Sequence, residues 1–578
     1  MSQTSTEHTT GTTFDHGVDV LVVGAGSGGF TAALAASERG LRTLVIEKAS
    51  WYGGSSSLSG GGVWVPGAPA QTRLGHHLKP DDTFRYLKAI TEGLVSDARL
   101  HAYVDGAPQM LEFLENLDPD LQFVWKPGYP DYYPNLYGGS EQGSTINVPP
   151  VDLRTLGEDA DRLHPPLSVM PRGMWIGPTE LPDFYRLRQT WAGKRLFIKL
   201  IWRMLRARLT NERITTIGQA LMARLMLAVR KRDIELWLSS PLKSLIAENG
   251  RIVGALVERE GNLLRVRATG GVIIAAGGFD HNKAMRSTHQ PTARADVSLG
   301  AKTNTGDGVN AAVEAGAAVD LMDSAWWFPA VEWGPGRIQF SLNERMLPSQ
   351  IIVNGAGERW INEAAPYEDF GFEMIAKHET GVQHIPSWYI TDDWSWRRYV
   401  IFGHLPLPKI PFAPAPTGHA LPKAWVGSGS VQTASTLTEL AEKIGVPAGA
   451  LEKTVERYNT DAEAGTDTQF HRSESAYDRY YGDITLANPS LAPLHGGPYY
   501  AFRIILSDLG TNGGVVTDEH GRALRPDGSP LPGLYVTGNA SASVMGRSYA
   551  GAGSTIGPSM TFGFLAARHI AAHVREGE

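Results

Sequence analysis

Apolar runs and small residues alternate near the start of the chain in the order that a βαβ unit requires. An apolar run at 18–23 leads into the glycine-rich turn 24–29, an alanine-rich segment at 30–39 and a second apolar run at 43–46. This order predicts a strand, a tight turn, a helix and a parallel strand. The turn reads GAGSGG, and Glu47 ends the second strand. The unit therefore predicts a dinucleotide site, in which phosphates lie against bare backbone and helix amides and the carboxylate binds ribose.

A second tract of glycine and serine follows this unit at 53–62. A domain that binds NAD normally continues into its next helix here, whereas bare backbone along an extended ligand is typical of FAD-binding proteins. The sequence predicts FAD, and because there is no cysteine to form a cysteinyl link, we expect the binding to be non-covalent. The residues expected to bind FAD, from these tracts and from later segments, are Gly24, Ala25, Gly26, Ser27, Gly28, Gly29, Glu47, Lys48, Gly53, Gly54, Ser55, Ser56, Ser59, Gly60, Gly61, Gly62, Leu242, Ala276, Gly277, Gly278, Asp307, Gly538, Asn539, Ser554, Thr555 and Ile556.

Composition narrows the possible classes of function. The 578 residues exceed what one hydrophobic core usually supports, so we expect two domains. A net charge of -7 argues against nucleic-acid binding. Without cysteine there is no thiolate metal site; we expect no metal and assign any redox chemistry to the cofactor. No apolar run reaches the roughly 18 residues of a membrane span, and residues 1–16 are polar, which predicts a disordered N-terminus and a cytoplasmic protein.

The residue composition of the sequence changes twice more along the chain. Around residue 285 it becomes rich in Trp and Pro, and the apolar run 533–537 restores the cofactor-binding pattern. These changes predict an α/β protein in which a Rossmann-like FAD-binding domain carries an inserted α+β catalytic domain. The expected segments are the disordered N-terminus at 1–16, the first part of the FAD-binding domain at 17–285 with a helical insertion at about 184–232, the catalytic domain at 286–494 and the last part of the FAD-binding domain at 495–578.

Local patterns predict further elements. Apolar residues at helical spacing predict helix over 80–117 and over 218–232. The pair Asn249-Gly250 predicts a hairpin between the short strands of 234–268. The segment 128–134 is an aromatic loop bracketed by prolines, which suits either a side chain that must be held in place or a packed surface loop.

The helical insertion contains a basic amphipathic helix at 192–209. The apolar residues expected on one face are Leu196, Phe197, Leu200, Ile201, Met204 and Leu205. The basic residues expected on the other face are Arg195, Lys199, Arg203 and Arg206. Two interpretations stay open: a core-packing helix with a solvated basic side, or peripheral contact with an anionic membrane surface.

Several motifs combine into a family resemblance over nearly the whole length. They are GAGSGG with Glu47, AGGFDHN at 276–282, NTGDG at 304–308, LMDSAWW at 321–327, NEAAPY at 362–367, SDLGTNGG at 507–514 and GLYVTGNAS at 533–541. With these motifs the chain resembles the flavin-dependent 3-ketosteroid Δ1-dehydrogenases of the fumarate reductase-like superfamily. The resemblance implies an oxidoreductase of steroid degradation that introduces a C1–C2 double bond into the A-ring of a 3-ketosteroid. It also implies an electron acceptor such as a quinone.

The resemblance also implies the catalytic residues. Matched segment by segment, the tyrosines and the glycine that surround the steroid A-ring in that family become Tyr132, Tyr367, Tyr549 and Gly553. Tyr367 is expected to remove the C2 proton, with a hydrogen bond from Tyr132, while hydride passes from C1 to the flavin. Tyr549 and the Gly553 amide are expected to hold the ketone oxygen. The family has proline after its third tyrosine, whereas this chain has Ala550.

Three alternatives stay open. A fumarate reductase-like enzyme would need arginines to clamp its dicarboxylate; here Tyr549 stands where that arginine is expected, and Arg547 lies two positions away. A 3-ketosteroid Δ4-(5α)-dehydrogenase would share the cofactor and the substrate class but act on different ring carbons. A non-catalytic flavin or sterol carrier would bind without turnover.

Overall fold

A mixed sheet of eight strands is built around the apolar run that opens the chain. The computed structural model describes residues 13–167, 171–410 and 415–576, and within it β1 pairs in parallel with β2 and β11. The parallel strand β21 extends the sheet beside β11, and the hairpin β9–β10 pairs with the start of β11. The strands of this sheet are β1 (His16–Val23), β2 (Thr43–Ile46), β8 (Glu235–Trp237), β9 (Leu242–Glu248), β10 (Arg251–Arg259), β11 (Asn262–Ile274), β20 (Arg522–Leu524) and β21 (Pro530–Val536).

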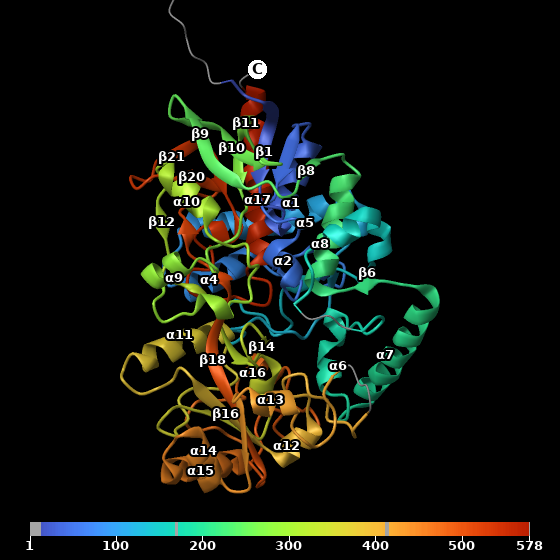
Figure 1. The fold of residues 1–578 in the computed structure, drawn as a ribbon, viewed down its shortest axis with the longest axis vertical. Coiled ribbons are helices and arrows are strands. Elements are labelled where there is room, and N and C mark those ends of the chain that lie inside the picture. Colours follow the sequence, from blue (N-terminus) through green and yellow to red (C-terminus); the bar gives the residue numbers. More distant parts are fainter. Residues whose placement is uncertain (1–12, 168–170, 411–414, 577–578) are drawn as a thin grey trace, which may run out of the picture.

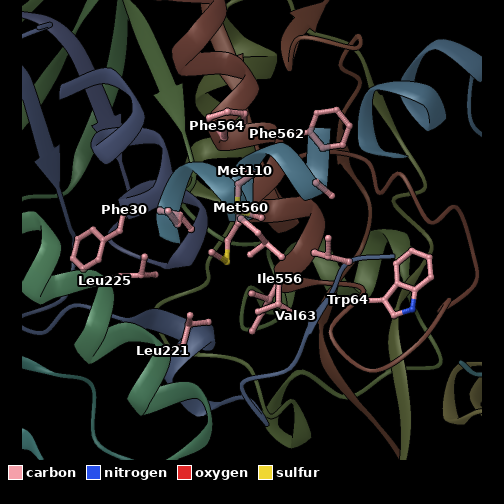
Figure 2. Close-up of a cluster of buried hydrophobic side chains, with 14 of the residues drawn as sticks. Phe30, Val63, Trp64, Met110, Leu221, Leu225, Ile556, Met560, Phe562 and Phe564 are labelled. Atoms are coloured by element: carbon pink, nitrogen blue, oxygen red, sulfur yellow. The ribbon is translucent and has the colours of Figure 1, made fainter. Parts of the chain in front are cut away.

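Helices from distant parts of the chain cover this sheet and share one core. The main ones are α1 (Ser27–Glu38), α5 (Asp97–Leu117), α8 (Ile217–Arg230) and α17 (Ile556–Glu576). Figure 2 shows side chains from all four of these helices meeting with Val63 and Trp64 of β3 (Val63–Trp64). Because the C-terminal helix packs on the first helix, the two ends of the chain close around the βαβ unit.

A second, antiparallel sheet forms the other half of the molecule, at the bottom of Figure 1. Its strands are β13 (Ala325–Glu332), β14 (Ile338–Phe340), β15 (Gln350–Val353), β16 (Ser387–Asp392), β17 (Val431–Ala434) and β18 (Tyr499–Thr511). Helix α11 (Tyr367–His378) packs on β13, and α14 (Leu437–Ile444) and α15 (Ala448–Ala464) cover the outer end. The α/β fold with a second α+β half agrees with the sequence-based prediction.

The remaining elements form the connections between and around the two sheets. Short strands make three small sheets: β3, β4 (Val124–Trp125) and β5 (Thr145–Asn147); β6 (Val151–Asp152) and β7 (Ile214–Thr215); β12 (Val319–Asp320) and β19 (Gly514–Val515). Other helices are α2 (Gly54–Leu58), α4 (Pro80–Thr91), α6 (Leu181–Tyr185), α7 (Trp191–Thr210), α9 (Lys283–His289), α10 (Asp307–Glu314), α12 (Asp393–Arg398), α13 (Lys423–Gly427) and α16 (Ala476–Arg479).

The local predictions fit with small shifts. The hairpin at Asn249-Gly250 joins β9 to β10, and the helix expected over 80–117 is broken into α4 and α5. Residues 54–58, within the second glycine- and serine-rich tract, form the short helix α2. The division into domains stays a proposal. The boundary between the catalytic domain and the last part of the FAD-binding domain was expected at 494, whereas β18, which begins at Tyr499, pairs inside the second sheet. Of the N-terminal segment expected to be disordered, residues 1–12 lie outside the described residues.

The face assignment of the basic helix is wrong in part. In α7, Leu196 and Leu200 are buried as expected, but Arg203 is buried with them. Its guanidinium lies 3.4 Å from the ring centre of Trp175 and donates to Glu180 at 2.8 Å. Ile201 and Leu205, expected on the inner face, are exposed instead. The half-buried carboxylate of Glu180, which the periodicity of α7 alone does not reveal, pairs with the arginine and holds it on the inner face.

Candidate active site

The turn between β1 and α1 is shaped by glycines that neighbouring backbone approaches closely. Gly24 has a φ of 109°, and a Cβ there would lie 2.3 Å from the Ala275 carbonyl oxygen. A Cβ on Gly29 would lie 1.9 Å from the oxygen of Gly24, so glycine lets the helix pack on the strand. At Gly26 the nearest atom is 3.6 Å away, and at Gly60 nothing lies within 4 Å. Both of these glycines border a cavity, so their missing side chains leave room for a ligand.

Glu47 stands at the end of β2 beside this turn. Its carboxylate accepts from the backbone amides of Ala25 at 3.0 Å and Ala49 at 2.8 Å. Burial raises the pKa of Glu47, while these amides act in the opposite direction. A carboxylate fixed by amides and facing the cavity is suited to accept hydrogen bonds from ribose hydroxyls.

Segments far apart in sequence complete the cradle. Lys48 donates to Asp307 at the N-terminal end of α10 at 2.5 Å. The Ser55 hydroxyl accepts from the Ala301 amide at 2.9 Å and from Asn304 at 3.0 Å. Lys48 and the second glycine-rich tract are thereby joined to the chain that follows β11. Together with the bare backbone at Gly26 and Gly60, these donors fit an extended dinucleotide that carries a pyrophosphate.

A single cavity of about 350 Å³ runs from this cradle to the junction of the two sheets. Of the residues expected to bind FAD or substrate, those that line it are Gly24, Gly26, Ser27, Gly28, Glu47, Lys48, Gly54, Ser55, Ser56, Ser59, Gly60, Gly61, Gly62, Tyr132, Leu242, Ala276, Gly277, Asp307, Tyr367, Gly538, Asn539, Tyr549, Gly553, Thr555 and Ile556. Ala25, Gly29, Gly53, Gly278 and Ser554 do not line it. They shape the surrounding backbone: Gly53 donates to Ala25, and a Cβ on Gly278 would lie 2.0 Å from the Thr511 hydroxyl.

The three expected tyrosines meet at the far end of the cavity. The ring centres of Tyr132 and Tyr367 are 5.4 Å apart, those of Tyr367 and Tyr549 5.0 Å, and those of Tyr132 and Tyr549 5.5 Å. All three side chains are buried. They come from the 126–144 loop, the start of α11 and the loop before α17, so the folded chain brings three distant segments to one point.

Asp131 fixes the loop that carries Tyr132. Its carboxylate accepts from the Trp64 indole at 2.8 Å and from the amides of Ser144 at 3.0 Å and Ser140 at 3.2 Å. Burial raises the pKa of Asp131 to about 7, against the effect of these donors. The backbone amide of Tyr132 also donates to the Ala550 carbonyl at 3.0 Å, which ties this loop to the segment of Tyr549.

The electrostatics of the cluster favour neutral hydroxyls. Burial raises the pKa of Tyr367 well above its ordinary value, and Tyr549 raises it further, whereas hydrogen bonding with Tyr132 lowers it. Burial also raises the pKa of Tyr549, and hydrogen bonding with Thr555, Tyr367 and the Gly553 amide lowers it. The Tyr549 hydroxyl is 3.1 Å from that of Thr555. A hydroxyl and a backbone amide are thus close enough to act on one acceptor.

Other residues line the same end of the cavity and were not expected from the sequence. They are mainly aromatic or apolar and include Tyr129, Phe328, Phe340, Leu342, Tyr480 and Tyr481. The rings of Tyr129 and Tyr480 are stacked with their centres 4.5 Å apart. The adjacent pair Tyr480-Tyr481 was a signal in the sequence, but an aromatic pair in a long irregular segment is equally compatible with a packed loop. The apolar lining suits a flat hydrophobic ligand.

Comparison with known proteins identifies the family. The model of the FAD binding domain family matches residues 19–556. The chain belongs to this family. The 3-oxosteroid 1-dehydrogenase of Mycolicibacterium smegmatis is 41% identical over 96% of this chain and 97% of its own length. The 4-oxocyclohex-2-ene-1-carboxylate 5-dehydrogenase of Sinomonas cyclohexanicum is 33% identical over 98% of this chain and 95% of its own length.

A solved structure is similar over the same extent. The 3-ketosteroid Δ1-dehydrogenase of Sterolibacterium denitrificans, in complex with 1,4-androstadiene-3,17-dione, has a TM-score of 0.85 and 38% sequence identity. The similarity covers 96% of this chain and all of that one, 100%. FAD is therefore the cofactor of this fold, as the glycine tracts predicted, and the bare backbone and the donors of the cradle fit it.

We predict that Gly26→Ala leaves the protein folded but weakens its retention of FAD. The new methyl group would meet only an ordinary contact with Ser56 but would occupy space at the phosphate cradle. The ratio of flavin to protein absorbance after gel filtration should fall, with the melting temperature measured in parallel. Gly449→Ala is the matched control, because it adds a methyl group to exposed helix α15 with nothing within 4 Å. Full flavin content in Gly26→Ala would contradict the placement of the phosphates.

Proposed function

We propose that the protein is an FAD-dependent 3-ketosteroid Δ1-dehydrogenase, which introduces a C1–C2 double bond into the A-ring of a 3-ketosteroid. The observation that carries this proposal is the buried tyrosine cluster at the end of the FAD cavity, in a chain similar over its whole length to 3-oxosteroid 1-dehydrogenases. FAD, when bound, supplies the hydride acceptor. The protein supplies the remaining requirements, a base for an acidic proton and donors for the ketone oxygen.

Tyr549 and the Gly553 amide are the proposed donors to the ketone oxygen. Their closeness is consistent with the hydrogen bonding that lowers the pKa of Tyr549. As the C2 proton leaves, negative charge develops on that oxygen, and removing one such donor commonly costs about 3–4 kcal/mol of transition-state stabilisation. Donors fixed in a buried site stabilise this charge without reorganisation.

Tyr367 is the proposed base that takes the proton from C2. It touches both other tyrosines of the cluster, and its ring lies 4.6 Å from that of Phe328. A tyrosine ionises near pH ~10 in water, and each unit by which its pKa is lowered requires about 1.4 kcal/mol of preferential phenolate stabilisation. Tyr132 is positioned to give part of that stabilisation through its hydrogen bond.

The lining of the cavity disfavours a dicarboxylate substrate. Among the described residues, no arginine borders the cavity, and Lys48 is already paired with Asp307. Arg547 donates to Asp323 at 2.7 Å in an exposed position. A fumarate-like dianion needs charge-assisted donors, which are missing here, whereas a neutral ketone needs only the hydroxyl and the amide. The same argument weighs against a cyclohexenone carboxylate.

Anaerobic mixing with a substrate panel tests the proposal. Androst-4-ene-3,17-dione should reduce the FAD and yield the 1,4-diene, identified by mass and by the position of the double bond. A saturated 5α-3-ketosteroid converted to a 4-ene product would instead assign the Δ4-(5α) activity. Reduction by 4-oxocyclohex-2-ene-1-carboxylate alone, or reoxidation of reduced protein by fumarate, would also overturn the proposal. If no 3-ketosteroid reduces the FAD, a carrier role replaces it.

A quinone is the proposed electron acceptor. The end of the cavity is lined by apolar and aromatic side chains, which suit a flat apolar ring as well as a steroid. After the product leaves, the same space gives a quinone access to the cofactor.

We also propose that α7 contacts an anionic membrane surface. Helix α7 lies at the outer edge of the molecule (Figure 1), and apolar residues at helical spacing face outward from it. Trp191 is 76% exposed, Ile198 66%, Trp202 58% and Leu209 87%. The helix carries no acidic residue, and Lys194 and Arg206 lie over the Trp191 and Trp202 rings. Tryptophan beside basic residues on an exposed apolar stripe is typical of helices that lie in a lipid interface.

Because of the position of α7, contact of this helix with a membrane would bring the cavity close to the lipid. Residues just before it, Pro178 and Leu181, line the cavity together with Leu167. A membrane-bound helix here would place the mouth of the cavity near the lipid phase, in which steroids and quinones dissolve. Among the described residues, no helix has the length and apolar character to span a bilayer, so the contact would be peripheral.

Vesicle sedimentation at low and high salt tests this contact. At low salt the protein should pellet with vesicles that contain phosphatidylglycerol, and less of it should pellet with vesicles of pure phosphatidylcholine. High salt should reduce the pelleting with phosphatidylglycerol vesicles, and so should the double substitution Ile198→Glu/Trp202→Glu. Leu263→Glu is the matched control, because it changes an exposed leucine on β11 far from α7. Unchanged pelleting of the double variant, or none with anionic vesicles at low salt, would refute the contact.

A further inference from the structure

A buried arginine stands behind the tyrosine cluster. Arg345 lies in a short 3-10 helix just after Leu342, which lines the cavity, and its side chain is fully buried. No carboxylate pairs with its guanidinium among the described residues. Its donors go to backbone carbonyls instead, so the positive charge is hydrogen-bonded but not neutralised. A buried cation of this kind is costly, which makes it a candidate for a functional role.

The partners of Arg345 belong to the segment that delivers Tyr367. Its Nη1 donates to the carbonyls of Glu363 at 2.7 Å and Ala365 at 2.8 Å, and its Nε donates to Ser341 at 2.7 Å. Tyr367 follows Ala365 by two residues and begins α11. The guanidinium also lies 5.1 Å from the ring centre of Phe370, one turn further along the helix. Through these contacts Arg345 fixes the segment that carries Tyr367, the proposed base.

Two buried polar groups near the cluster, one of them on Arg345, lack a hydrogen-bond partner among the described residues. They are Nη2 of Arg345 and the hydroxyl of Tyr477. Tyr477 is fully buried in α16, and its ring centre is 4.6 Å from that of Tyr132. Burial raises the pKa of Tyr477 well above its ordinary value, and the positive charge of Arg345 acts in the opposite direction. Burial lowers the pKa of Arg345, and Tyr477 and Tyr132 act against that effect. Tyr477, Tyr132 and Tyr367 thus lie in successive ring contact, and the charge of Arg345 acts on the first of them.

We propose that Arg345 is a positioning residue whose buried positive charge stabilises the phenolate form of Tyr367, acting through Tyr477 and Tyr132. This inference rests on the proposed function. Burial opposes the ionisation of Tyr367, and its aromatic neighbours are neutral. The charge of Arg345 would supply stabilisation of the phenolate that these neighbours do not. Arginine suits the role because it keeps its charge at all accessible pH values.

Other ionisable groups around this line set the pH at which it acts. Burial raises the pKa of Glu344 to about 7, so this neighbour becomes negative at alkaline pH and then opposes the effect of Arg345. Burial lowers the pKa of Arg345, and Arg472, a second positive charge, lowers it further. The groups that act on Arg345, Tyr477 and Tyr367 are Tyr129, Tyr132, Glu344, Arg472, Asp478 and Tyr549. The net charge of this set falls as pH rises, whereas Arg345 stays constant.

The experiment compares the pH dependence of anaerobic FAD reduction by androst-4-ene-3,17-dione in the wild type and in four variant proteins. In Arg345→Gln the acidic limb of the profile should move to higher pH by about one unit or more, because an opposite charge near an acid commonly shifts it by that amount. Arg345→Lys also loses the guanidinium fork but keeps the charge, so its limb should stay nearer to that of the wild type. Tyr477→Phe should move the limb in the same direction as Arg345→Gln.

The fourth variant separates this role from a structural one. Tyr458→Phe removes another fully buried hydroxyl, which donates to Ala492 in the same half of the molecule. It should lower stability without moving the limb. An equal shift in Arg345→Gln and Arg345→Lys would show a purely structural role and overturn the inference. If Arg345→Gln does not fold, an unmoved limb in Tyr477→Phe is decisive against it.

A second readout does not depend on turnover. Tyrosinate absorbance, followed during alkaline titration of the purified protein and corrected with Tyr367→Phe, should show the cluster ionising at higher pH in Arg345→Gln than in the wild type. Failure of the proposed function would appear as wild-type FAD that no 3-ketosteroid reduces, whatever the titration shows. Failure of the inference would appear as unchanged titration of the cluster.

Discussion

The central constraint of the proposed mechanism is that a tyrosine must ionise where charge is penalised. Tyr367, the proposed base, is buried among other aromatic residues at the place proposed for the apolar steroid ring. That burial raises its pKa well above the ordinary value, which by itself would leave it protonated and inactive. The surroundings must therefore return part of the lost stabilisation. Tyr132 does so by hydrogen bonding, and the proposed contribution of Arg345 does so by charge.

The fold serves this constraint by bringing distant segments to one place. The first sheet holds the cofactor cradle, and the second carries Phe328 on β13 next to α11. Tyr132 is held by Asp131 and by the backbone of Ala550, and Tyr367 by the carbonyl contacts of Arg345. Tyr367 at the start of α11 meets Tyr132 and Tyr549 from the cofactor-binding half, so the cluster lies where the two halves meet.

Features formed by residues close together in the sequence could be predicted, whereas features formed by distant residues could not. The cradle depends on glycines and an acid within a single βαβ unit, so a short pattern was enough for Gly26 and Glu47. The tyrosines required a resemblance, because nothing in the residues around Tyr132 or Tyr549 distinguishes them from packing residues. Arg345 could not be found this way, since its role depends on Tyr477, more than a hundred residues away. For α7, apolar residues on several sides left the periodicity without a unique buried face.

The most direct test of this account is a single turnover of Tyr367→Phe under anaerobic conditions. The variant keeps the ring and removes only the hydroxyl, and Tyr480→Phe is the control, because Tyr480 lines the cavity without a proposed role. If Tyr367 is the base, Tyr367→Phe should bind androst-4-ene-3,17-dione with an affinity within a few fold of the wild type but reduce FAD more slowly by about 10²–10⁴-fold. Reduction within tenfold of the wild-type rate, with steroid bound, would contradict the role of Tyr367 as the base.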